Sequence, residues 1–198
     1  MNDRPAARVQ DRRLLAGLGA IVKQIGDQRY PPVDKWDPAF CGDIDIHILR
    51  DGRWLYRGSP ITRQPLVKLF ASVLRRDVQK GPYFLVTPAE KLAIRVDVAP
   101  LLAVEATISG AGRDQVIALR TNVDDFVIVD AEHPLWVEQD RQSGEPVPLV
   151  RVRGLIDALL TRAVFYELAG IAEPKAPDGP LGVWSSGQFF ALGHADDA

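Results

Sequence analysis

Residues 43–48 alternate strictly between polar side chains and isoleucine. A period of two residues is the pattern of a β-strand with one buried and one exposed face. The dipeptide Asp51-Gly52 follows and can supply the two positive-φ positions of a type I′ turn. The sequence therefore predicts a β-hairpin with a two-residue loop, in which His47 faces Tyr56 on the neighbouring strand.

In that register, the polar face of the hairpin collects acids, an imidazole and large aromatic side chains: Asp43, Asp45, His47, Trp54 and Tyr56. The mixture suits neither an ordinary core nor an ordinary surface, so this face is the first candidate site. Side chains two residues apart on a strand lie about 6 to 7 Å apart and can converge on a metal. No second histidine stands near His47, so we predict no metal and expect a stacked, hydrogen-bonded His47 with Asp45 as its partner.

The residues after the hairpin predict a helix. Thr62 fits the N-cap position, and Pro65 falls in the first turn, where its missing N–H costs little. Apolar side chains then recur at helical spacing, namely Leu66, Leu69, Phe70, Val73 and Leu74. The first half of the chain therefore contains a strand–strand–helix unit.

The second half repeats the order of hairpin and helix. Four short strands are predicted first, at 101–108, 115–120, 126–129 and 135–138. From Gly154 onward, apolar residues at helical spacing predict a helix of about sixteen residues. The segment around Arg153 resembles the one around Arg63, so both arginines would stand at helix starts. Two similar units imply an α+β fold with a duplicated strand–strand–helix core.

Composition divides the chain into four segments. Residues 1–41 combine a helix, predicted at 11–26, with a proline-rich strap; 42–100 and 101–172 are two small α+β domains; 173–198 hold a linker and an aromatic tail. The tail is too aromatic to remain in solvent, so we predict that it docks on the body of the protein.

The charge balance, the cysteine count and the length of the apolar runs argue against several classes of protein. The charge balance is 24 basic against 26 acidic residues, which gives no electrostatic footprint for nucleic acid or for an anionic membrane surface. Cys41 is the single cysteine, so it forms no intramolecular disulfide, and no Cys/His spacing suggests zinc. No signal segment and no run of about 20 apolar residues occurs. We therefore expect a cytoplasmic protein without a membrane partner.

Three arginines could hold an anion. Arg57, Arg63 and Arg153 present guanidinium groups, and Arg63 could act together with helix N-terminal amides. With Trp54, Tyr56 and Trp184 as stacking surfaces, they would suit a planar anionic ligand such as a nucleotide. The more common alternative is that these arginines form salt bridges with local acids such as Asp157.

Other polar residues suggest sites more weakly. Asn122 and Asp124 lie in a cluster of turn-forming residues that could position a ligand, although the cluster lacks the spaced oxygens of a calcium loop. Ser185 does not complete a G-x-S-x-G motif, because the preceding glycine is Gly182. No P-loop, G-x-G-x-x-G or H-E-x-x-H motif is present, so we expect no enzyme of a known motif class and no cofactor.

Several motifs, in order, resemble a known family. They are PPVDKWDPAFCGDIDI, GRWLYRGSPITRQPLVKLF, TNVDD, HPL and GVWSSGQFF. Together they are similar to the uncharacterised bacterial family called domain of unknown function 1285, over about residues 31–193. The resemblance implies two small α+β domains, the second superficially like a pleckstrin-homology domain, with a ligand cleft between them. The family has no established activity, so it implies no catalytic residues.

The sequence thus favours a non-enzymatic ligand-binding or signalling module that binds a small anionic or nucleotide-like ligand, or a protein segment, in a cleft between two related halves. The alternative is an enzyme that uses Asp45 and His47, with Asp43 or Asp124, for acid–base chemistry on an anionic substrate. A role in assembly ranks third. An enzyme predicts that Asp45, His47 and an arginine share one pocket, whereas an assembly protein would expose a broad apolar patch.

Overall fold

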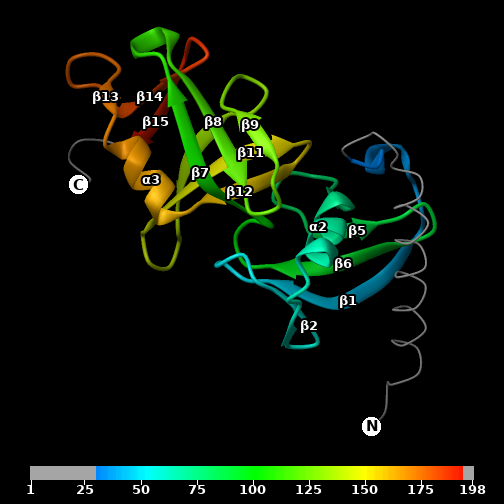
Figure 1. The fold of residues 1–198 in the computed structure, drawn as a ribbon. Coiled ribbons are helices and arrows are strands. Elements are labelled where there is room, and N and C mark those ends of the chain that lie inside the picture. The colour runs from blue at the N-terminus through cyan, green and yellow to red at the C-terminus, as the bar shows by residue number, and fades with distance from the viewer. Residues whose placement is uncertain (1–29, 194–198) are drawn as a thin grey trace. The chain divides into compact units, whose positions relative to one another are not determined.

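The computed structural model describes residues 30–193. The chain forms two compact units, Met1–Asp97 and Val98–Ala198, each of which has its own sheet (Figure 1). The helix predicted at 11–26 lies outside the described residues. No helix in the part of the chain that the structure describes is long and apolar enough to cross a membrane.

Over residues 30–97, the N-terminal unit contains the 3-10 turn η1 (Val33–Lys35), one six-stranded sheet and one α-helix. Its elements are β1 (Phe40–Ile48), β2 (Trp54–Tyr56), β3 (Ser59–Pro60), α2 (Gln64–Ser72), β4 (Leu74–Arg76), β5 (Tyr83–Val86) and β6 (Lys91–Val96). The strand order is β3-β2-β1-β6-β5-β4, in which β1 and β6 are parallel and the other pairs are antiparallel. Phe70, a member of the predicted apolar stripe, is buried in α2. Val67 is also buried, although the predicted stripe did not include it.

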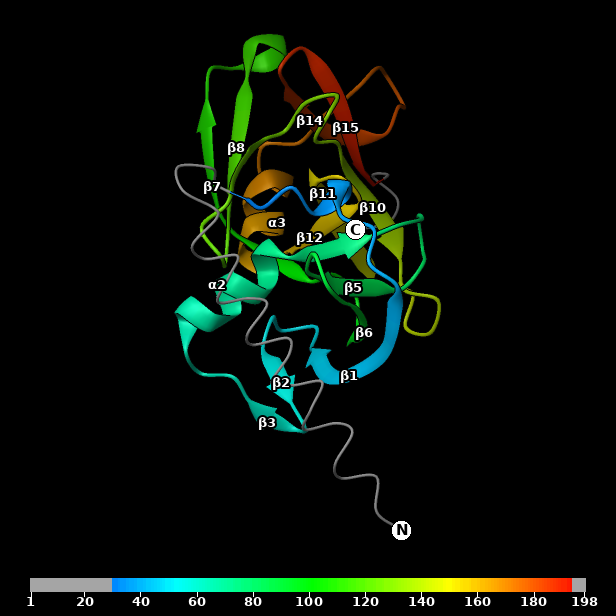
Figure 2. The same ribbon diagram turned by 90° about the vertical axis from the view of Figure 1, so that its right-hand side faces the viewer.

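Up to Gly193, where the described part ends, the C-terminal unit contains a second six-stranded sheet, the 3-10 turn η2 (Gly112–Asp114), one α-helix and a small three-stranded sheet. The large sheet holds β7 (Leu101–Ser109), β8 (Val116–Thr121), β9 (Phe126–Ile128), β10 (Leu135–Gln139), β11 (Pro146–Arg153) and β12 (Ile156–Leu160). The remaining elements are α3 (Arg162–Ala169), β13 (Glu173–Pro174), β14 (Leu181–Ser185) and β15 (Gln188–Gly193). Helix α3 lies against β7 and β12 (Figure 2).

The two large sheets have the same topology. The second has the order β10-β11-β12-β7-β8-β9. In each sheet, two antiparallel three-stranded meanders meet through a central parallel pair formed by the first and last strands, which are β1 with β6 and β7 with β12. The predicted α+β fold of two related halves is therefore confirmed. The helix differs in position, because α2 connects the two meanders whereas α3 follows the second one.

The predicted sixteen-residue helix after Gly154 is wrong. Ile156–Leu160 is strand β12, and all five of its residues are buried. A short apolar run that is covered on both sides has no periodicity that separates a strand from a helix. The helix begins only after Thr161, whose hydroxyl accepts a hydrogen bond from the Val164 amide at 3.5 Å. Arg153 consequently ends strand β11 and does not stand at a helix start.

The predicted register of the first hairpin is also wrong. The turn has three residues, because the Leu49 amide donates to the Arg53 carbonyl at 2.9 Å and Gly52 takes a φ of +79°. The two-residue turn with positive φ at both positions occurs one strand later, at Arg57-Gly58 between β2 and β3.

The extra turn residue moves Trp54 and Tyr56 to the other face of the sheet, because a one-residue slip reverses every side chain of a strand. Ile48 pairs with Trp54, and Ile46 pairs with Tyr56. Trp54 is only 2% exposed, and its ring stacks on that of Phe70 with centroids 6.1 Å apart. The proposed grouping of these aromatic side chains with His47 is therefore incorrect.

Candidate functional site

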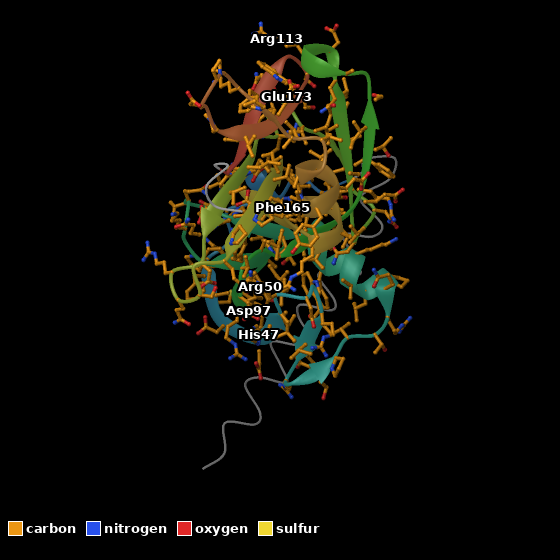
Figure 3. The ribbon with its side chains drawn as sticks, turned by 90° about the vertical axis from the view of Figure 1, so that its left-hand side faces the viewer. His47, Arg50, Asp97, Arg113, Phe165 and Glu173 are labelled. Carbon is orange, nitrogen blue, oxygen red and sulfur yellow. The ribbon has the colours of Figure 1, made fainter. Side chains whose placement is uncertain are left out.

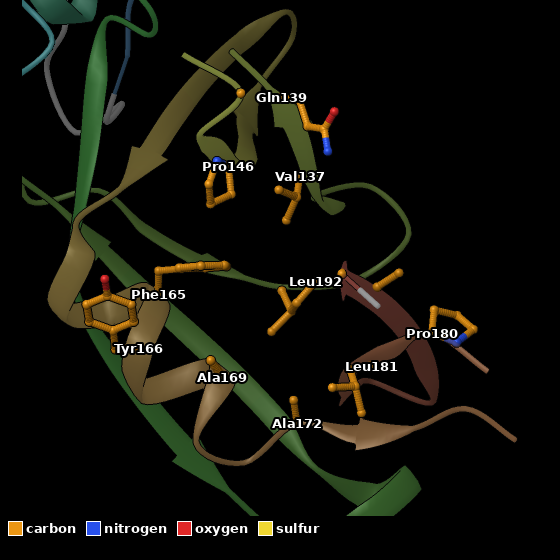
Figure 4. A pocket seen from close by; sticks show the side chains of 13 residues that line it. Val137, Gln139, Pro146, Phe165, Tyr166, Ala169, Ala172, Pro180, Leu181 and Leu192 are labelled. Carbon is orange, nitrogen blue, oxygen red and sulfur yellow. The ribbon is translucent and has the colours of Figure 1, made fainter. Parts of the chain in front are cut away.

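A groove in the C-terminal unit is the main candidate site. It has a volume of about 720 Å³, within the range of small-molecule pockets. Its walls are the edge strand β10, helix α3 with the residues after it, and the β14–β15 hairpin (Figure 4). The residues that line it are Val137, Gln139, Gly144, Pro146, Phe165, Tyr166, Ala169, Ala172, Pro180, Leu181, Ala191, Leu192 and Gly193.

No lining residue of this groove is charged. Phe165 and Leu192 form apolar walls on opposite sides, and the carboxamide of Gln139 is a polar side-chain group on the β10 wall (Figure 4). Tyr166 is 66% exposed, so its hydroxyl lies within reach of solvent. The groove can therefore take an apolar molecule with few hydrogen-bonding groups, because burying an unpaired charge there would be costly.

The β14–β15 wall is fixed to the large sheet by Ser185. This residue is fully buried, and its hydroxyl donates to the Val129 carbonyl at 2.6 Å and accepts from the Ile117 amide at 3.0 Å. Ile117 lies on β8 and Val129 directly follows β9, so one side chain ties this side of the sheet to the hairpin. Ser185 is thus a positioning residue whose hydroxyl is satisfied by backbone groups.

Trp184 lies on the same hairpin but does not line the groove. Its ring contacts Phe189 edge to face with centroids 5.3 Å apart, and the Arg113 guanidinium lies 4.8 Å from the ring centroid. The Gln115 carboxamide donates to the Trp184 carbonyl at 2.8 Å. These contacts hold the hairpin against η2 and β8.

The N-terminal unit contains a second candidate site, a polar cluster around His47. The imidazole Nε2 lies 2.6 Å from Asp97 Oδ1, and Asp97 Oδ2 accepts from the Arg50 amide at 3.1 Å (Figure 3). Asp45, two residues before His47 on β1, forms a 3.1 Å ion pair with Arg95. The predicted His47–Asp45 hydrogen bond is therefore replaced by one to Asp97, a residue that the sequence reasoning missed.

The other predicted residues of this unit lie apart from the His47 cluster. Asp43 is exposed on β1. Arg57 stacks on Tyr56 at 5.1 Å from the ring centroid, and its amide donates to the Asp45 carbonyl. Arg63 is exposed and occupies the N-cap position of α2, one residue after the predicted cap.

Asn122 and Asp124 belong to a tight turn between β8 and β9. It has the geometry of the first hairpin turn, with Asp124 at φ +65° in the place of Gly52. Asn122 Oδ1 accepts from the Leu102 amide at 3.1 Å and so ties the turn to β7. Asp124 pairs with Arg120 at 3.2 Å. The pKa of Arg120 is raised, mainly by its hydrogen bond to Glu105.

Arg153 is held by a buried acid. Its Nη1 lies 3.1 Å from Asp125 Oδ2, immediately after the turn that contains Asp124. Arg151 pairs with Asp157, and its guanidinium lies 5.6 Å from the centroid of the Trp136 ring. The salt-bridge alternative that was weighed for the arginines therefore describes Arg153, with a different acid as its partner.

The groove residues were not singled out from the sequence. Phe165 and Leu192 look like ordinary core positions, and the three walls of the groove come from segments that are distant in sequence. The aromatic tail was the only usable signal, because it required a surface on which to dock. The predicted cleft between the two halves stays a prediction.

Comparisons with known proteins agree on a family. Residues 31–99 match the model described as "Domain of unknown function (DUF1285), N-terminal domain", and residues 100–192 match "Protein of unknown function (DUF1285), C-terminal domain". A search of curated proteins finds no match.

Two solved structures are similar. A DUF1285 family protein from Silicibacter pomeroyi DSS-3 is 43% identical, with a TM-score of 0.82, over 91% of this chain and 96% of that one. One from Shewanella baltica OS155 is 23% identical, with a TM-score of 0.49, over 64% of this chain and 91% of that one. The family models and the first structure show that this chain belongs to the DUF1285 family.

Proposed function

We propose that the protein is a cytoplasmic, non-enzymatic binding module whose C-terminal unit holds a small, neutral, largely apolar molecule in the groove between β10, α3 and β15. The observation that carries the proposal is the combination of a 720 Å³ cavity with a lining free of charged side chains. The groove therefore offers apolar burial as its main source of affinity.

The chemistry of the lining defines the ligand further. The Gln139 carboxamide and the Tyr166 hydroxyl offer side-chain hydrogen bonds, and both can donate or accept. A ligand with one or two uncharged polar groups can satisfy them while its apolar part lies against Phe165 and Leu192. The anionic ligand predicted from the sequence has no support at this groove, because none of the three candidate arginines lines it.

Binding of the neutral fluorophore N-phenylnaphthylamine tests the proposal. Its emission rises in apolar sites, so titration of the full chain should give a saturable signal. Ala169→Phe places a ring in the groove and should weaken binding by about tenfold, equivalent to about 1.4 kcal/mol. Ala163→Phe is the matched control, because Ala163 is also exposed on α3 but does not line the groove. Equal affinities for the two variants would reject the groove as the binding site.

The alternative, an acid–base enzyme, keeps one supporting observation. Asp97 lies 2.6 Å from His47 Nε2, an arrangement that orients an imidazole for proton transfer by its other nitrogen. Asp45 is paired with Arg95 and would not take part directly. Hydrolysis of a panel of aryl esters and phosphate esters that is abolished in His47→Gln would support this alternative. Equal rates in both proteins would exclude His47 as the base.

A further inference from the structure

Gln139 carries a polar side chain of the groove that is available to a ligand. Among the 13 residues that line the groove, only Gln139 and Tyr166 have a polar side-chain group. Gln139 is exposed, and within residues 30–193 its carboxamide forms no hydrogen bond. A bound molecule can satisfy this carboxamide, which holds an acceptor oxygen and two donor hydrogens.

Strand pairing holds Gln139 beside an apolar surface. Gln139 is the last residue of β10 and pairs with Pro146 of β11, and Val137 lies two residues earlier on the same face of β10. Both neighbours line the groove (Figure 4). The carboxamide therefore stands at the edge of an apolar surface, where a hydrogen bond is stronger than one in bulk water.

Phe165 offers a flat apolar face to the same groove. Its ring lies on the α3 wall, opposite Leu192 of β15 (Figure 4). The Tyr166 ring lies beside it, with centroids 6.3 Å apart and the ring planes tilted by 39°. Aromatic rings pack well against other planar rings, so this wall favours a flat ligand over a branched aliphatic one.

The hydrogen-bonding pattern of a carboxamide defines the polar edge of such a ligand. The carbonyl oxygen accepts and the NH₂ group donates, side by side in one plane. A glutamine can therefore form two hydrogen bonds with a ring edge that carries a donor next to an acceptor, as glutamines of DNA-binding proteins do with adenine. A carboxylate or an ammonium group satisfies only one half of the carboxamide and would bring a charge to an uncharged lining.

We infer that the natural ligand of the groove is a neutral, planar aromatic heterocycle with a hydrogen-bond donor beside an acceptor, such as a lactam or an aminopyridine. Its ring packs against Phe165, and Gln139 binds its polar edge through two hydrogen bonds. The inference rests on the function proposed above, and it narrows the small, neutral, largely apolar ligand of that proposal to one chemical class.

Two probes that differ by one methyl group test the ligand class. 2-Quinolone is a planar lactam with an N–H beside its carbonyl, whereas 1-methyl-2-quinolone has the same rings and carbonyl without the donor. Isothermal titration calorimetry of the 198-residue chain measures both dissociation constants. 2-Quinolone should bind at least about fivefold more tightly, because its analogue leaves the Gln139 oxygen unpaired.

Substitution of Gln139 tests which residue makes this distinction. In Gln139→Leu the preference should fall below about twofold, since leucine keeps an apolar wall but has no hydrogen-bonding group. Gln142→Leu is the matched control, because Gln142 is also exposed, follows in the loop after β10, and does not line the groove. The control should keep the full preference for 2-quinolone.

A third variant should exchange the preference. Gln139→Glu replaces the donor with a second acceptor, and protonated 2-aminoquinoline presents two N–H donors in the geometry that a carboxylate binds. The variant should therefore bind 2-aminoquinoline at least about fivefold more tightly than the unchanged protein does, and 2-quinolone more weakly. A glutamine that only shaped the groove would not produce this exchange.

Three outcomes would overturn the inference. The first is that the unchanged protein does not distinguish the two quinolones or binds neither, the second is a preference that persists in Gln139→Leu, and the third is no gain of affinity for 2-aminoquinoline in Gln139→Glu. If N-phenylnaphthylamine still binds and Ala169→Phe still weakens it, the small-molecule function stands and only the ligand class is rejected. If Ala169→Phe changes neither fluorophore nor quinolone binding, the groove itself is rejected and the inference falls with it.

Discussion

Asp125 and Arg153 form an ion pair in which Asp125 Oδ2 lies 3.1 Å from Arg153 Nη1, and the two side chains are 7% and 20% exposed. The pair joins the turn between β8 and β9 to the end of β11. The Asp125 amide also donates to the Thr121 hydroxyl at 3.0 Å, which fixes the acid within its turn.

Removing one member of this pair should destabilise the C-terminal unit. Asp125→Ala leaves the Arg153 guanidinium without this buried partner and should lower the free energy of unfolding by about 3 kcal/mol. The double variant Asp125→Leu/Arg153→Met should recover most of that loss, because it buries no charge. Urea denaturation of the three proteins measures both values. A double variant that is as unstable as the single one would mean that the pair contributes more than charge compensation.

The role of Ser185 in fixing the groove wall predicts a specific loss. Ser185→Ala leaves the Ile117 amide and the Val129 carbonyl without this partner and should lower the free energy of unfolding by about 2 kcal/mol. Ser186→Ala is the control. Ser186 also donates to the Val129 carbonyl, at 3.2 Å, but it is exposed, so its replacement should cost less than about 0.5 kcal/mol. Similar losses of stability from both variants would refute the role of Ser185 in fixing the groove wall.

Asp77 should make stability depend on pH in the acidic range. Burial would raise its pKa, but hydrogen bonds and charge from Lys91 and Arg75 outweigh that effect and lower the pKa. A lowered folded-state pKa contributes stability that is present above the unfolded value, near pH 4, and is lost as pH falls through the folded value. Asp77→Asn should therefore cost about 0.5 to 1 kcal/mol at pH 7 and nothing at the lowest pH, since partial exposure screens the pair.

The matched control for Asp77 is Asp37→Asn, which changes an exposed carboxylate of the same unit. Its stability difference from the wild type should be small throughout the pH range. Thermal denaturation of the three proteins from pH 3 to pH 7 measures the effect. If the stability difference between Asp77→Asn and the wild type stayed constant down to pH 3, the lowered pKa of Asp77 would be contradicted.

The sequence predicted the strands better than their connections. The alternating isoleucines identify β1, because only in a strand do residues two positions apart lie on the same face. Asp51-Gly52 did not predict the turn length, because Gly52 fits both a two-residue and a three-residue turn. The three-residue turn is the one that places Trp54 in the core beside Phe70. Such a choice is made by tertiary packing.

The same limit applies to β12 and to the candidate sites. Ile156–Leu160 is buried on both faces, so its apolar run has no readable period. Asp97 meets His47 only because β1 and β6 are parallel neighbours, a pairing across 50 residues that no local pattern encodes. The groove arises where β10 faces a docked tail, and its uncharged lining carries no motif.

Mapping N-phenylnaphthylamine binding by amide NMR on the 198-residue chain tests the binding groove most directly. The predicted result is that the largest shift changes occur at Val137, Gln139, Ala169 and Leu192, that they saturate with one ligand per chain, and that they disappear in Ala169→Phe but persist in Ala163→Phe. Shift changes that concentrate around His47 and Asp97, or that remain in Ala169→Phe, would contradict the account.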